Sequence, residues 1–574
     1  MPPGIFIFKM TSQKTLTAWG GHTTLDKILE KPNYYKEYYA KRWWLGLTFG
    51  DILDQAADMY PNREALVTER VRLTYRQLRE KVNRVAIAFL ELGVNKGNKV
   101  LIQLPNWEEF FFVFFALHKI GAVAVIGLPR HAEREVEYLS NLTEAVAWVV
   151  PSRYKKINYL PLIQSIQAKN PVLKWPIVVG DEVPQGCVSF HEITSRVKME
   201  RHPDNYLEKF RPDPLDMANI LLTGGTTGFP KGVPRTHNDH ICNGYYWMKA
   251  WERTSYDNCL IATPVGHNLA HTCAIYPMVL AGGKVTVITS TSSKEILETI
   301  EAEKITCTTL VPAQLPTLLG DPNLSKYNLS SIQSIQSGGA HVAPEWVRGV
   351  YDKIGCRYFS NDFGMAEGPC CCTRREDPEE IVCTTVGIPL CPYDRFKIID
   401  DEEKEVPMGT EGELVARGPG VFAGYYKADE ENRKVFTHDG FFRTGDLGKM
   451  INEQRYLRIT GRKKDIIIRG AENISATEVE ELILSHPSAE DTAVVGMPDP
   501  VLGERICAYV KLAQGKKLSF DEMISHLKQK GASVLLLPER LEIVEELPLT
   551  NVGKVDKKAL RVDIAEKIKG ASSS

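Results

Sequence analysis

Strand-like and helix-like hydrophobic patterns alternate along the first part of the chain, from Phe49 onward. The apolar runs at 100–105 and 122–129 are short and rich in β-branched residues, as buried strands are. Between them, the phenylalanine-rich run 110–117 follows Asn-Trp-Glu-Glu and predicts a buried helix, since it is far shorter than the roughly 20 residues that span a bilayer. The same rhythm returns at 219–228, 284–291 and 307–314. The pattern predicts an α/β fold with parallel-rich sheets.

The pattern changes after about residue 390. Short strand-like runs separated by turn residues predict an antiparallel, β-barrel-like subdomain at about 390–460. A last unit begins with a strand at 465–469, followed by the capping-box pattern Ser475-x-x-Glu478 and a helix with Val479, Leu482 and Ile483 on one face. We therefore expect an N-terminal extension at 1–47, a large domain at 48–463 and a small α+β domain at 464–574.

The amino-acid composition restricts the kinds of molecule that the protein is expected to bind. The 574 residues include 70 Lys plus Arg and 72 Asp plus Glu, a net charge of −2, which gives no basic excess for nucleic acid or an anionic membrane. A small molecule is the expected partner. The N-terminal ten residues lack the features of a signal peptide, and the 12 cysteines have no regular spacing, so we expect reduced thiols and a cytoplasmic location.

The stretch 221–237, LLTGGTTGFPKGVPRTH, has the composition of a phosphate-binding loop. Glycines allow backbone N–H groups to approach a phosphate, threonine hydroxyls donate further hydrogen bonds, and Lys231 supplies positive charge. It is not a Walker A motif, because Lys231 stands between proline and glycine. A flexible Gly/Thr turn is the alternative for this stretch alone.

Three further signals are weak when each is taken alone. Asp446 follows a turn in FFRTGDLG, where a carboxylate could accept hydrogen bonds from a ribose diol, although most Gly-Asp pairs are turns. Arg462 belongs to GRKKD, which alone indicates a solvated loop, and Lys554 belongs to NVGK, which alone indicates a surface lysine.

The order of these motifs is more specific than any one of them. The Gly/Thr loop, GMAEG at 364–368, TGD, GRKKD and NVGK follow one another as in the adenylate-forming superfamily, which the chain resembles from about 48 to 565. That superfamily includes acyl-CoA synthetases, aryl-acid AMP ligases and adenylation domains. The GHN at 266–268, the PRTH after the loop and the downstream REDPEE make the chain most similar to stand-alone aryl-acid AMP ligases of siderophore pathways, such as those acting on 2,3-dihydroxybenzoate.

The resemblance implies an ATP site and a magnesium ligand. Glu367 is expected to bind the Mg²⁺ of MgATP, a hard cation that suits a carboxylate oxygen. Asp446 is expected to hold the ribose hydroxyls and Arg462 the ribose or phosphate, while Phe363 packs on adenine. The other expected nucleotide residues are Thr223, Gly224, Gly225, Thr226, Thr227, Gly228 and Lys231 on the phosphates, with Gly338, Gly339, Ala340, Asn361, Asp362, Gly364 and Met365 around the base.

The resemblance also implies a two-step reaction. A carboxylic acid and MgATP give an acyl-AMP and pyrophosphate, and the acyl group then passes to a pantetheine thiol, of an aryl carrier protein or of CoA. Lys554, with Glu367, Thr227 and Arg462, is expected to serve the first step by stabilising charge. The C-terminal domain is expected to be mobile, with its hinge at Lys464, and the 469–473 loop to face the second step.

The expected acid pocket contains His267, Asn268, Cys273, Gly338 and Cys370. Asn268 could hydrogen-bond a carboxylate or the ortho-hydroxyl of an acid such as salicylate. By the same resemblance Cys273 disfavours a 3-hydroxyl, whereas Leu269 and Cys370 fit neither the dihydroxybenzoate nor the salicylate pattern, so the expected acid is 2,3-dihydroxybenzoate-like or salicylate-like. Both cysteines also fit as small apolar filler, and His267 fits a gating or packing role.

Other functions remain open at this stage. An aryl- or acyl-CoA ligase is the nearest alternative, since CoA and a carrier protein present the same pantetheine arm. A non-catalytic nucleotide-binding protein is disfavoured by Glu367, Asp446 and Lys554. A protein kinase, suggested by Asp-Phe-Gly at 362–364, lacks the His-Arg-Asp loop before it. Three consecutive cysteines on a strand alternate in direction and suit a metal poorly. The oligomeric state, monomer or homodimer, is left open.

Overall fold

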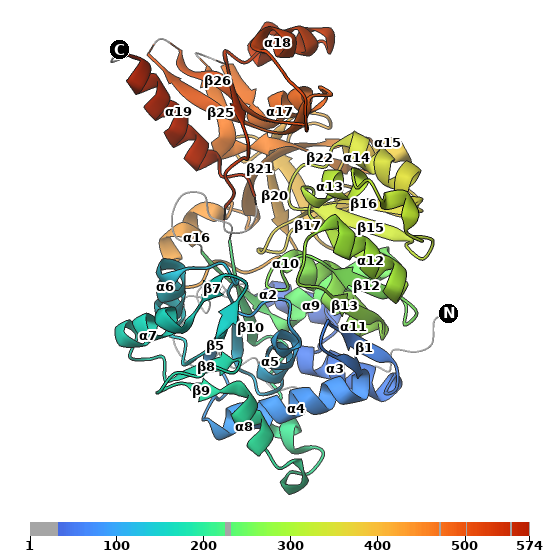
Figure 1. Cartoon of the computed structure of the whole chain (residues 1–574), viewed down its shortest axis with the longest axis vertical. Coiled ribbons are helices and arrows are strands. Elements are labelled where there is room, and N and C mark those ends of the chain that lie inside the picture. The colour runs from blue at the N-terminus through green and yellow to red at the C-terminus, as the bar shows by residue number, and fades with distance from the viewer. Residues whose placement is uncertain (1–31, 224–230, 470–471, 501, 551–553, 573–574) are drawn as a thin grey trace.

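A computed structural model describes residues 32–223, 231–469, 472–500, 502–550 and 554–572 of the chain. These residues form sheets of nine, seven, five and four strands and one two-stranded ribbon, β6 (Arg153–Tyr154) with β7 (Ile157–Asn158). The two large sheets and their helices make up the lower part of Figure 1, and the C-terminal unit lies at its top.

The nine-stranded sheet is parallel through its centre. Its strand order is β18-β17-β16-β15-β14-β12-β13-β1-β2, and only β2, β17 and β18 pair antiparallel with their neighbours. The strands predicted at 284–291 and 307–314 are confirmed as β13 and β14. The bounds are β1 (Glu64–Val67), β2 (Arg72–Thr74), β12 (Asn258–Ile261), β13 (Lys284–Val287), β14 (Cys307–Leu310), β15 (Ser334–Gly338), β16 (Tyr358–Gly364), β17 (Cys370–Cys372) and β18 (Ile388–Pro389).

The seven-stranded sheet has the order β11-β10-β4-β3-β5-β8-β9, parallel except for the hairpin of β10 and β11. This hairpin carries the Gly/Thr loop at its turn. The bounds are β3 (Lys99–Ile102), β4 (Val123–Ile126), β5 (Ala147–Pro151), β8 (Trp175–Val179), β9 (Val188–Ser189), β10 (Met217–Leu222) and β11 (Gly232–Thr236). The predicted strands at 100–105 and 122–129 are confirmed in β3 and β4. Of the run at 219–228, residues 219–222 belong to β10, and residues 224–228 lie outside the described residues.

One hydrophobic core joins the two large sheets. Side chains of β1 and β13 from one sheet and of β3 and β4 from the other share it with helices α3, α4 and α5. Every residue of α5 is buried, which confirms the predicted phenylalanine-rich helix. The helices of this part of the chain are α2 (Pro32–Ala40), α3 (Phe49–Met59), α4 (Tyr75–Glu91), α5 (Glu108–Lys119), α6 (Glu133–Thr143), α7 (Leu160–Lys169), α8 (Phe190–Arg196), α9 (His237–Ala250), α10 (Asn268–Ala270), α11 (Tyr276–Ala281), α12 (Ser293–Glu303), α13 (Gln314–Leu319), α14 (Pro344–Gly349), α15 (Glu379–Thr384) and α16 (Asp429–Val435).

The region at 395–462 is antiparallel, as predicted. Strands β19 (Arg395–Ile399), β20 (Gly412–Arg417), β21 (Phe442–Ile451) and β22 (Tyr456–Arg462) pair in chain order. The sheet stays open, because no pairing joins β19 to β22 among the described residues. The expected barrel-like closure is therefore not formed by these strands.

The C-terminal unit is an α+β structure, as predicted. Ser475 Oγ accepts a hydrogen bond from Glu478 N at the start of α17, which is the Ser475 half of the predicted capping box, and Val479 and Ile483 are buried. Its elements are β23 (Ile466–Arg469), β24 (Glu472–Ser475), α17 (Ala476–Leu484), β25 (Ala489–Asp499), β26 (Gly503–Leu512), α18 (Phe520–Gln529), β27 (Arg540–Val544) and α19 (Lys557–Ser572).

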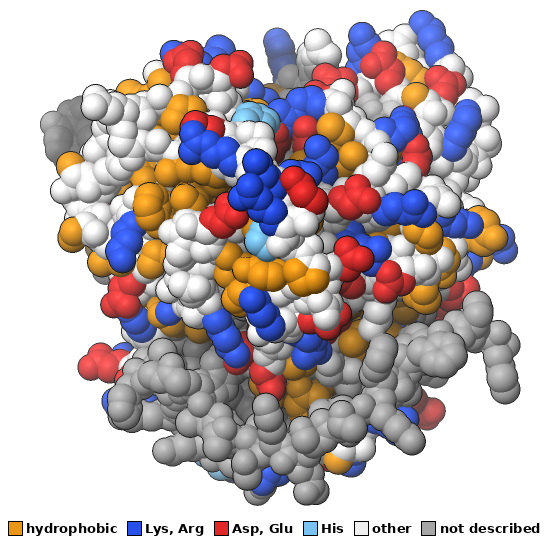
Figure 2. All heavy atoms as spheres, turned by 90° about the horizontal axis from the view of Figure 1, so that it is seen from below, with side chains coloured by type: hydrophobic (Ala, Val, Ile, Leu, Met, Phe, Trp, Pro, Cys, Tyr) orange, Lys and Arg blue, Asp and Glu red, His pale blue; other side chains and the backbone are white. Residues whose placement is uncertain are grey.

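One end of the molecule carries charges of both signs. Figure 2 shows the end of the molecule away from the C-terminal unit, where basic and acidic side chains are interspersed over the described part of the face. Within the described ranges, no helix combines the length and the apolar character needed to cross a membrane.

Candidate active site

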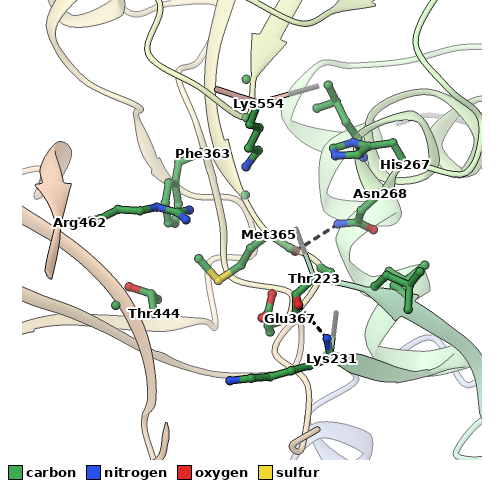
Figure 3. A pocket seen from close by; sticks show the side chains of 18 of the residues that line it. Thr223, Lys231, His267, Asn268, Phe363, Met365, Glu367, Thr444, Arg462 and Lys554 are labelled. Carbon is green, nitrogen blue, oxygen red and sulfur yellow. Dashed lines mark hydrogen bonds between the residues drawn. The ribbon is translucent and has the colours of Figure 1, made fainter. Parts of the chain in front are cut away.

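A cavity of about 800 Å³ lies between the two large sheets, the four-stranded sheet and the C-terminal unit. Its lining brings together residues that are far apart in sequence, from β10, α10, the end of β16, β21, β22 and the segment before α19. Figure 3 shows that Lys554 enters from the C-terminal unit between Phe363 and His267, above Met365. Described residues from the two large sheets, the four-stranded sheet and the C-terminal unit therefore meet in one space.

The residues predicted for the acid pocket line one end of this cavity together. His267, Asn268, Cys273 and Cys370 all contribute, and Gly338 lies beside them. Sequence reasoning assigned no role to Trp247, which also lines this end and packs in one cluster with Cys273 and Cys370. Trp247 lies on a helix without any motif, so only its contacts reveal it.

Asn268 is held on both sides of its amide. Its Nδ2 donates to Met365 O at 3.2 Å, and His240 Nε2 lies 2.9 Å from its Oδ1 (Figure 3 shows the contact with Met365). His267 caps the same short helix, where its Nδ1 accepts a hydrogen bond from Leu269 N. Burial, and then the charge of Lys554, lowers the pKa of His267 to about 4. His267 is thus a neutral imidazole at neutral pH.

The three adjacent cysteines form strand β17 and alternate in direction. Cys371 joins the core beneath the four-stranded sheet with Phe363, whereas Cys370 and Cys372 join the cluster around Trp247. Burial raises the pKa of the Cys370 thiol to about 12, so it is protonated and apolar. We predicted that three adjacent cysteines on a strand suit a metal ion poorly, and this alternation in direction is the physical reason.

Asp362 shares the sheet face of Cys370 rather than that of Phe363. It lies opposite Cys372 and next to Gly338 in the strand register. Ser360 Oγ donates to its Oδ1, while Oδ2 is buried without a hydrogen-bond partner among the described residues. Asp362 therefore shares the sheet face of Cys370, and it lines both this cavity and the one that adjoins it.

A second cavity of about 680 Å³ adjoins the first. It is lined by Ala340, Asn361 and Asp446. The residues that it shares with the first cavity are Gly339, Asp362, Phe363, Gly364, Met365, Arg462, Asp465, Lys554 and Lys557. The two spaces are therefore connected, and Lys554 lies where they join.

Glu367 is buried, with 7% of its surface exposed. Tyr425 donates to its Oε1 at 2.7 Å, and Phe422 N donates to its backbone carbonyl at 2.8 Å. No hydrogen bond to Oε2 is formed within the described residues. Burial raises the pKa of Glu367, which favours a positive ligand near this carboxylate.

Two side chains missed by sequence reasoning fix the backbone on either side of Glu367. The buried Arg235 donates to Ala366 O at 2.8 Å, and Asn243 Nδ2 donates to Gly368 O at 3.1 Å. Arg235 also bonds Asn243 Oδ1 at 2.7 Å. Arg235 belongs to the PRTH element that contributed to the resemblance, so its position was marked in the sequence although its role was not.

The phosphate-loop prediction falls largely on residues that are not described. Gly224, Gly225, Thr226, Thr227 and Gly228 lie outside the described residues. The two ends of the loop are described: Lys231 N donates to Thr223 Oγ1 at 3.0 Å, and Thr223 N donates to Lys231 O at 3.1 Å.

Lys231 is paired within the protein. Its Nζ donates to Glu431 and lies 4.8 Å from the centre of the Tyr425 ring. The Lys231 ammonium is thus held near Glu367 through their shared neighbour Tyr425, at the end of the cavity where Thr223 lies (Figure 3).

Asp446 and Arg462 are neighbours across β21 and β22. Arg462 Nε lies 2.8 Å from Asp446 Oδ1, and Asp446 is 3% exposed. Its Oδ2 is buried without a partner in the described part of the chain. An unpartnered buried acceptor of this kind suits the hydroxyl groups of a sugar.

Lys554 follows the undescribed residues 551–553 and is anchored by its backbone. Its N donates to Thr550 Oγ1 at 3.2 Å, and Thr550 N donates to its carbonyl at 2.6 Å. Desolvation and the charge of Arg462 lower the pKa of Lys554 to about 8, against the opposite effect of Asp446 and Glu367. Lys464, the predicted hinge, lies in the 3₁₀ turn Lys463–Asp465 between the four-stranded sheet and β23. Of the 469–473 loop, residues 470 and 471 are not described.

The donor set fits a cation that keeps most of its waters. Among the described residues, no group of three or more His, Cys, Asp or Glu side chains is arranged to hold a metal ion. A single buried carboxylate such as Glu367 suits Mg²⁺, which protein sites commonly bind through one or two carboxylates and substrate phosphates.

Comparisons with known proteins agree with this geometry. A family model described as AMP-binding enzyme matches residues 53–426, and one described as AMP-binding enzyme C-terminal domain matches residues 478–554. The chain is 38% identical to 2,3-dihydroxybenzoate-AMP ligase of Bacillus subtilis over 94% of this chain and 97% of that protein. It is 34% identical to salicyl-AMP ligase / salicyl-S-ArCP synthetase of Mycobacterium tuberculosis over 91% and 92%. The apo structure of MbtA from Mycobacterium smegmatis superimposes with a TM-score of 0.70 at 34% identity, covering 92% of this chain and 97% of that one.

Proposed function

The chain belongs to the AMP-binding enzyme family and is an AMP-forming ligase, and from that premise we propose that it activates an aryl acid and passes it to the pantetheine thiol of a carrier protein. Adenylate-forming ligases generally use ATP and Mg²⁺. The relatives named for 2,3-dihydroxybenzoate and salicylate support an aryl acid for this chain.

One observation carries the proposal: Lys554 stands where the two cavities join. One cavity contains Asn268, Cys273 and Cys370, and the other contains Asp446. An acid in the first and an adenosine in the second would bring the carboxylate and the α-phosphate to the same ammonium group. Bringing the reactants together is a large part of catalysis in this chemistry.

In the proposed first step, a carboxylate oxygen of the acid attacks the α-phosphorus of ATP. The bond from that phosphorus to the bridging oxygen breaks, and pyrophosphate leaves. Lys554 would neutralise charge that develops on the reacting oxygens, and Asp446 would hold the ribose through its free Oδ2. Glu367 would hold Mg²⁺, which when bound neutralises charge on the phosphate oxygens.

In the proposed second step, the sulfur of a pantetheine thiolate attacks the acyl carbon, and AMP leaves. The enclosed and mainly apolar lining around Trp247, Cys273 and Cys370 would accept a flat ring and keep water from the acyl-AMP. We propose further that the units at 48–463 and 464–574 change their relative orientation about Lys464 between the steps.

Acid-dependent ATP–pyrophosphate exchange tests the proposal. Benzoate, salicylate, 2,3-dihydroxybenzoate, cyclohexanecarboxylate and a fatty acid are compared, and thioester formation is then measured with CoA and with a pantetheinylated aryl carrier protein. We expect exchange with the aromatic acids and transfer to the carrier protein. Exchange with the fatty acid alone would reject the aryl-acid assignment, and transfer to CoA alone would reject the carrier protein.

A further inference from the structure

A chain of buried polar side chains leads away from the acid pocket through Asn268. His240 Nε2 lies 2.9 Å from Asn268 Oδ1, Asn219 Nδ2 lies 3.1 Å from His240 Nδ1, and His118 Nε2 lies 2.9 Å from Asn219 Oδ1. His240, Asn219 and His118 are each 0% exposed. The chain crosses from α9 through β10 to α5, and none of the three residues lines the cavity.

The direction of each hydrogen bond follows from one carbonyl. Because Asn268 Nδ2 donates to Met365 O, its Oδ1 faces His240 and must accept. His240 therefore carries its proton on Nε2, and its Nδ1 accepts from Asn219 Nδ2. Asn219 Oδ1 then accepts from His118 Nε2. Each of these three hydrogen bonds has one donor and one acceptor only when His240 and His118 are neutral and carry their proton on Nε2.

The surroundings maintain these protonation states. Burial lowers the pKa of His240 well below its usual value, and the charge of the neighbouring Arg235 acts in the same direction. His271 is neutral too: its Nε2 lies 2.6 Å from Val265 O and must donate there, which leaves its Nδ1 to accept from Tyr276 OH at 2.8 Å. Tyr276 OH also lies 3.3 Å from His240 Nδ1; because the proton of the neutral His240 is on Nε2, Nδ1 has no hydrogen to donate to Tyr276 and remains an acceptor.

These hydrogen bonds determine which groups of the Asn268 amide remain available to a ligand in the cavity. Its oxygen accepts hydrogen bonds from His240 Nε2 and, at 3.4 Å, from Thr272 Oγ1, and one Nδ2 hydrogen is donated to Met365 O. No acceptor for the second Nδ2 hydrogen lies within hydrogen-bonding distance among the described residues. Asn268 can therefore present only a donor to a ligand in the pocket.

We propose that His240 is a positioning residue that fixes Asn268 as a hydrogen-bond donor and thereby selects acids with an acceptor oxygen ortho to the carboxylate. The inference rests on the proposed function. An ortho-hydroxyl that donates to its own carboxylate turns a lone pair outward and can accept from Asn268. An ortho-amino group turns an N–H outward and meets the Asn268 N–H donor to donor.

The test compares salicylate, anthranilate and benzoate with His240→Leu, which has similar bulk and no donor, and His240→Gln, whose amide can still donate. The wild type is expected to prefer salicylate over anthranilate by about 10- to 100-fold in kcat/KM, measured by pyrophosphate exchange. His240→Leu should lose most of that preference through a higher KM for salicylate, while the values for benzoate change little. His240→Gln should keep the preference.

His237→Leu is the matched control, because His237 is a buried histidine on the same helix that accepts from Phe49 N and lies outside the chain to Asn268. It should keep the ratio of salicylate to anthranilate even if its melting temperature falls. An equal loss for salicylate and benzoate in His240→Leu, or an unchanged preference, overturns the inference.

Calorimetric titration of the three acids without ATP separates this inference from the proposed function. If the wild type binds the acids with the same selectivity and His240→Leu loses it, the role of His240 is upheld. If, in addition, no acid supports pyrophosphate exchange, the proposed function fails while the role of His240 stands. Exchange with aromatic acids without any selectivity that depends on His240 upholds the function and rejects the inference.

Discussion

Asp446 and Arg462 lie directly opposite each other on β21 and β22, and Arg462 binds only one oxygen of the Asp446 carboxylate. The other oxygen is buried, and the described residues supply no hydrogen bond to it. The ion pair therefore does more than join two strands, because it orients a carboxylate whose second oxygen is available to a ligand.

Asp446→Asn should weaken ATP binding selectively. The change removes the negative charge of the carboxylate that Arg462 orients, and it removes one of the two oxygens that could accept a hydrogen bond from the ribose. Hydrogen bonds to charged groups contribute about 1.5–3 kcal/mol. We expect the KM for ATP to rise about 10- to 100-fold with the KM for the acid almost unchanged, as measured by pyrophosphate exchange. Glu453→Gln, on the exposed turn between the same strands, is the control. Equal rises in both KM values would contradict the assignment.

Lys554→Ala should separate the two half-reactions. Loss of a charge-stabilising group typically costs about 10²–10³ in rate, and we expect at least this loss in acyl-AMP formation. Thioester formation from chemically prepared acyl-AMP should change much less. Lys558→Ala removes an exposed lysine at the start of α19 and should affect neither step. Comparable losses in both steps for Lys554→Ala would remove Lys554 from its proposed role.

The same lysine predicts the alkaline side of the pH profile. Its pKa is lowered to about 8, so the ammonium form that stabilises negative charge is lost as the pH rises through that value. We expect kcat/KM for acyl-AMP formation to fall above pH 8. In Lys554→Arg the guanidinium stays charged, so whatever activity remains should show no such fall. If kcat/KM of Lys554→Arg also falls above pH 8 with the same midpoint, the group that loses its proton is not Lys554.

The sequence predicted the parts of the site that are local in the chain. The phosphate loop, GMAEG, TGD and NVGK are short motifs whose residue types suit their chemistry, and the alternation of patterns predicted the parallel sheets. His240, Asn243 and Tyr425 could not be found in this way, because each acts through a partner more than 25 positions away. Pairings of this kind depend on tertiary packing, which no local pattern records.

The structure also refined predictions that were based on strand periodicity. Asp362 and Phe363 were grouped at the nucleotide; because adjacent residues on a strand face opposite sides, Asp362 shares the sheet face of Cys370, and it lines both cavities. For the region at about 390–460 the pattern predicted an antiparallel or barrel-like subdomain, because short antiparallel strands with turns fit an open sheet as well as a closed one; closure depends on pairing between distant edges, and the described strands form the open sheet.

Tyr425→Phe should raise the magnesium requirement. The hydroxyl of Tyr425 donates to Glu367 Oε1 and so fixes the orientation of the carboxylate. A typical hydrogen bond contributes about 1 kcal/mol, which predicts an approximately fivefold higher Mg²⁺ concentration for half-maximal exchange, with the KM for the acid unchanged. Tyr426→Phe is the control, since Tyr426 packs in a different cluster. If Tyr425→Phe requires the same Mg²⁺ concentration as the wild type, the proposal that Glu367 binds the metal ion is contradicted.

Gly368→Ala should destabilise the protein and disturb Glu367 together. Gly368 has φ +107°, and a Cβ at this position would lie 2.0 Å from Gly420 O, so the segments that carry Glu367 and Phe422 would have to move apart. Gly409 also has a positive φ, +82°, but a Cβ there meets no atom within 4 Å, so Gly409→Ala measures the backbone strain alone, about 1 kcal/mol. We expect a clearly larger fall in melting temperature for Gly368→Ala and a loss of acyl-AMP formation at a temperature where the variant is still folded. Equal falls in the two variants would show that the contact between Gly368 and Gly420 does not hold Glu367 in place.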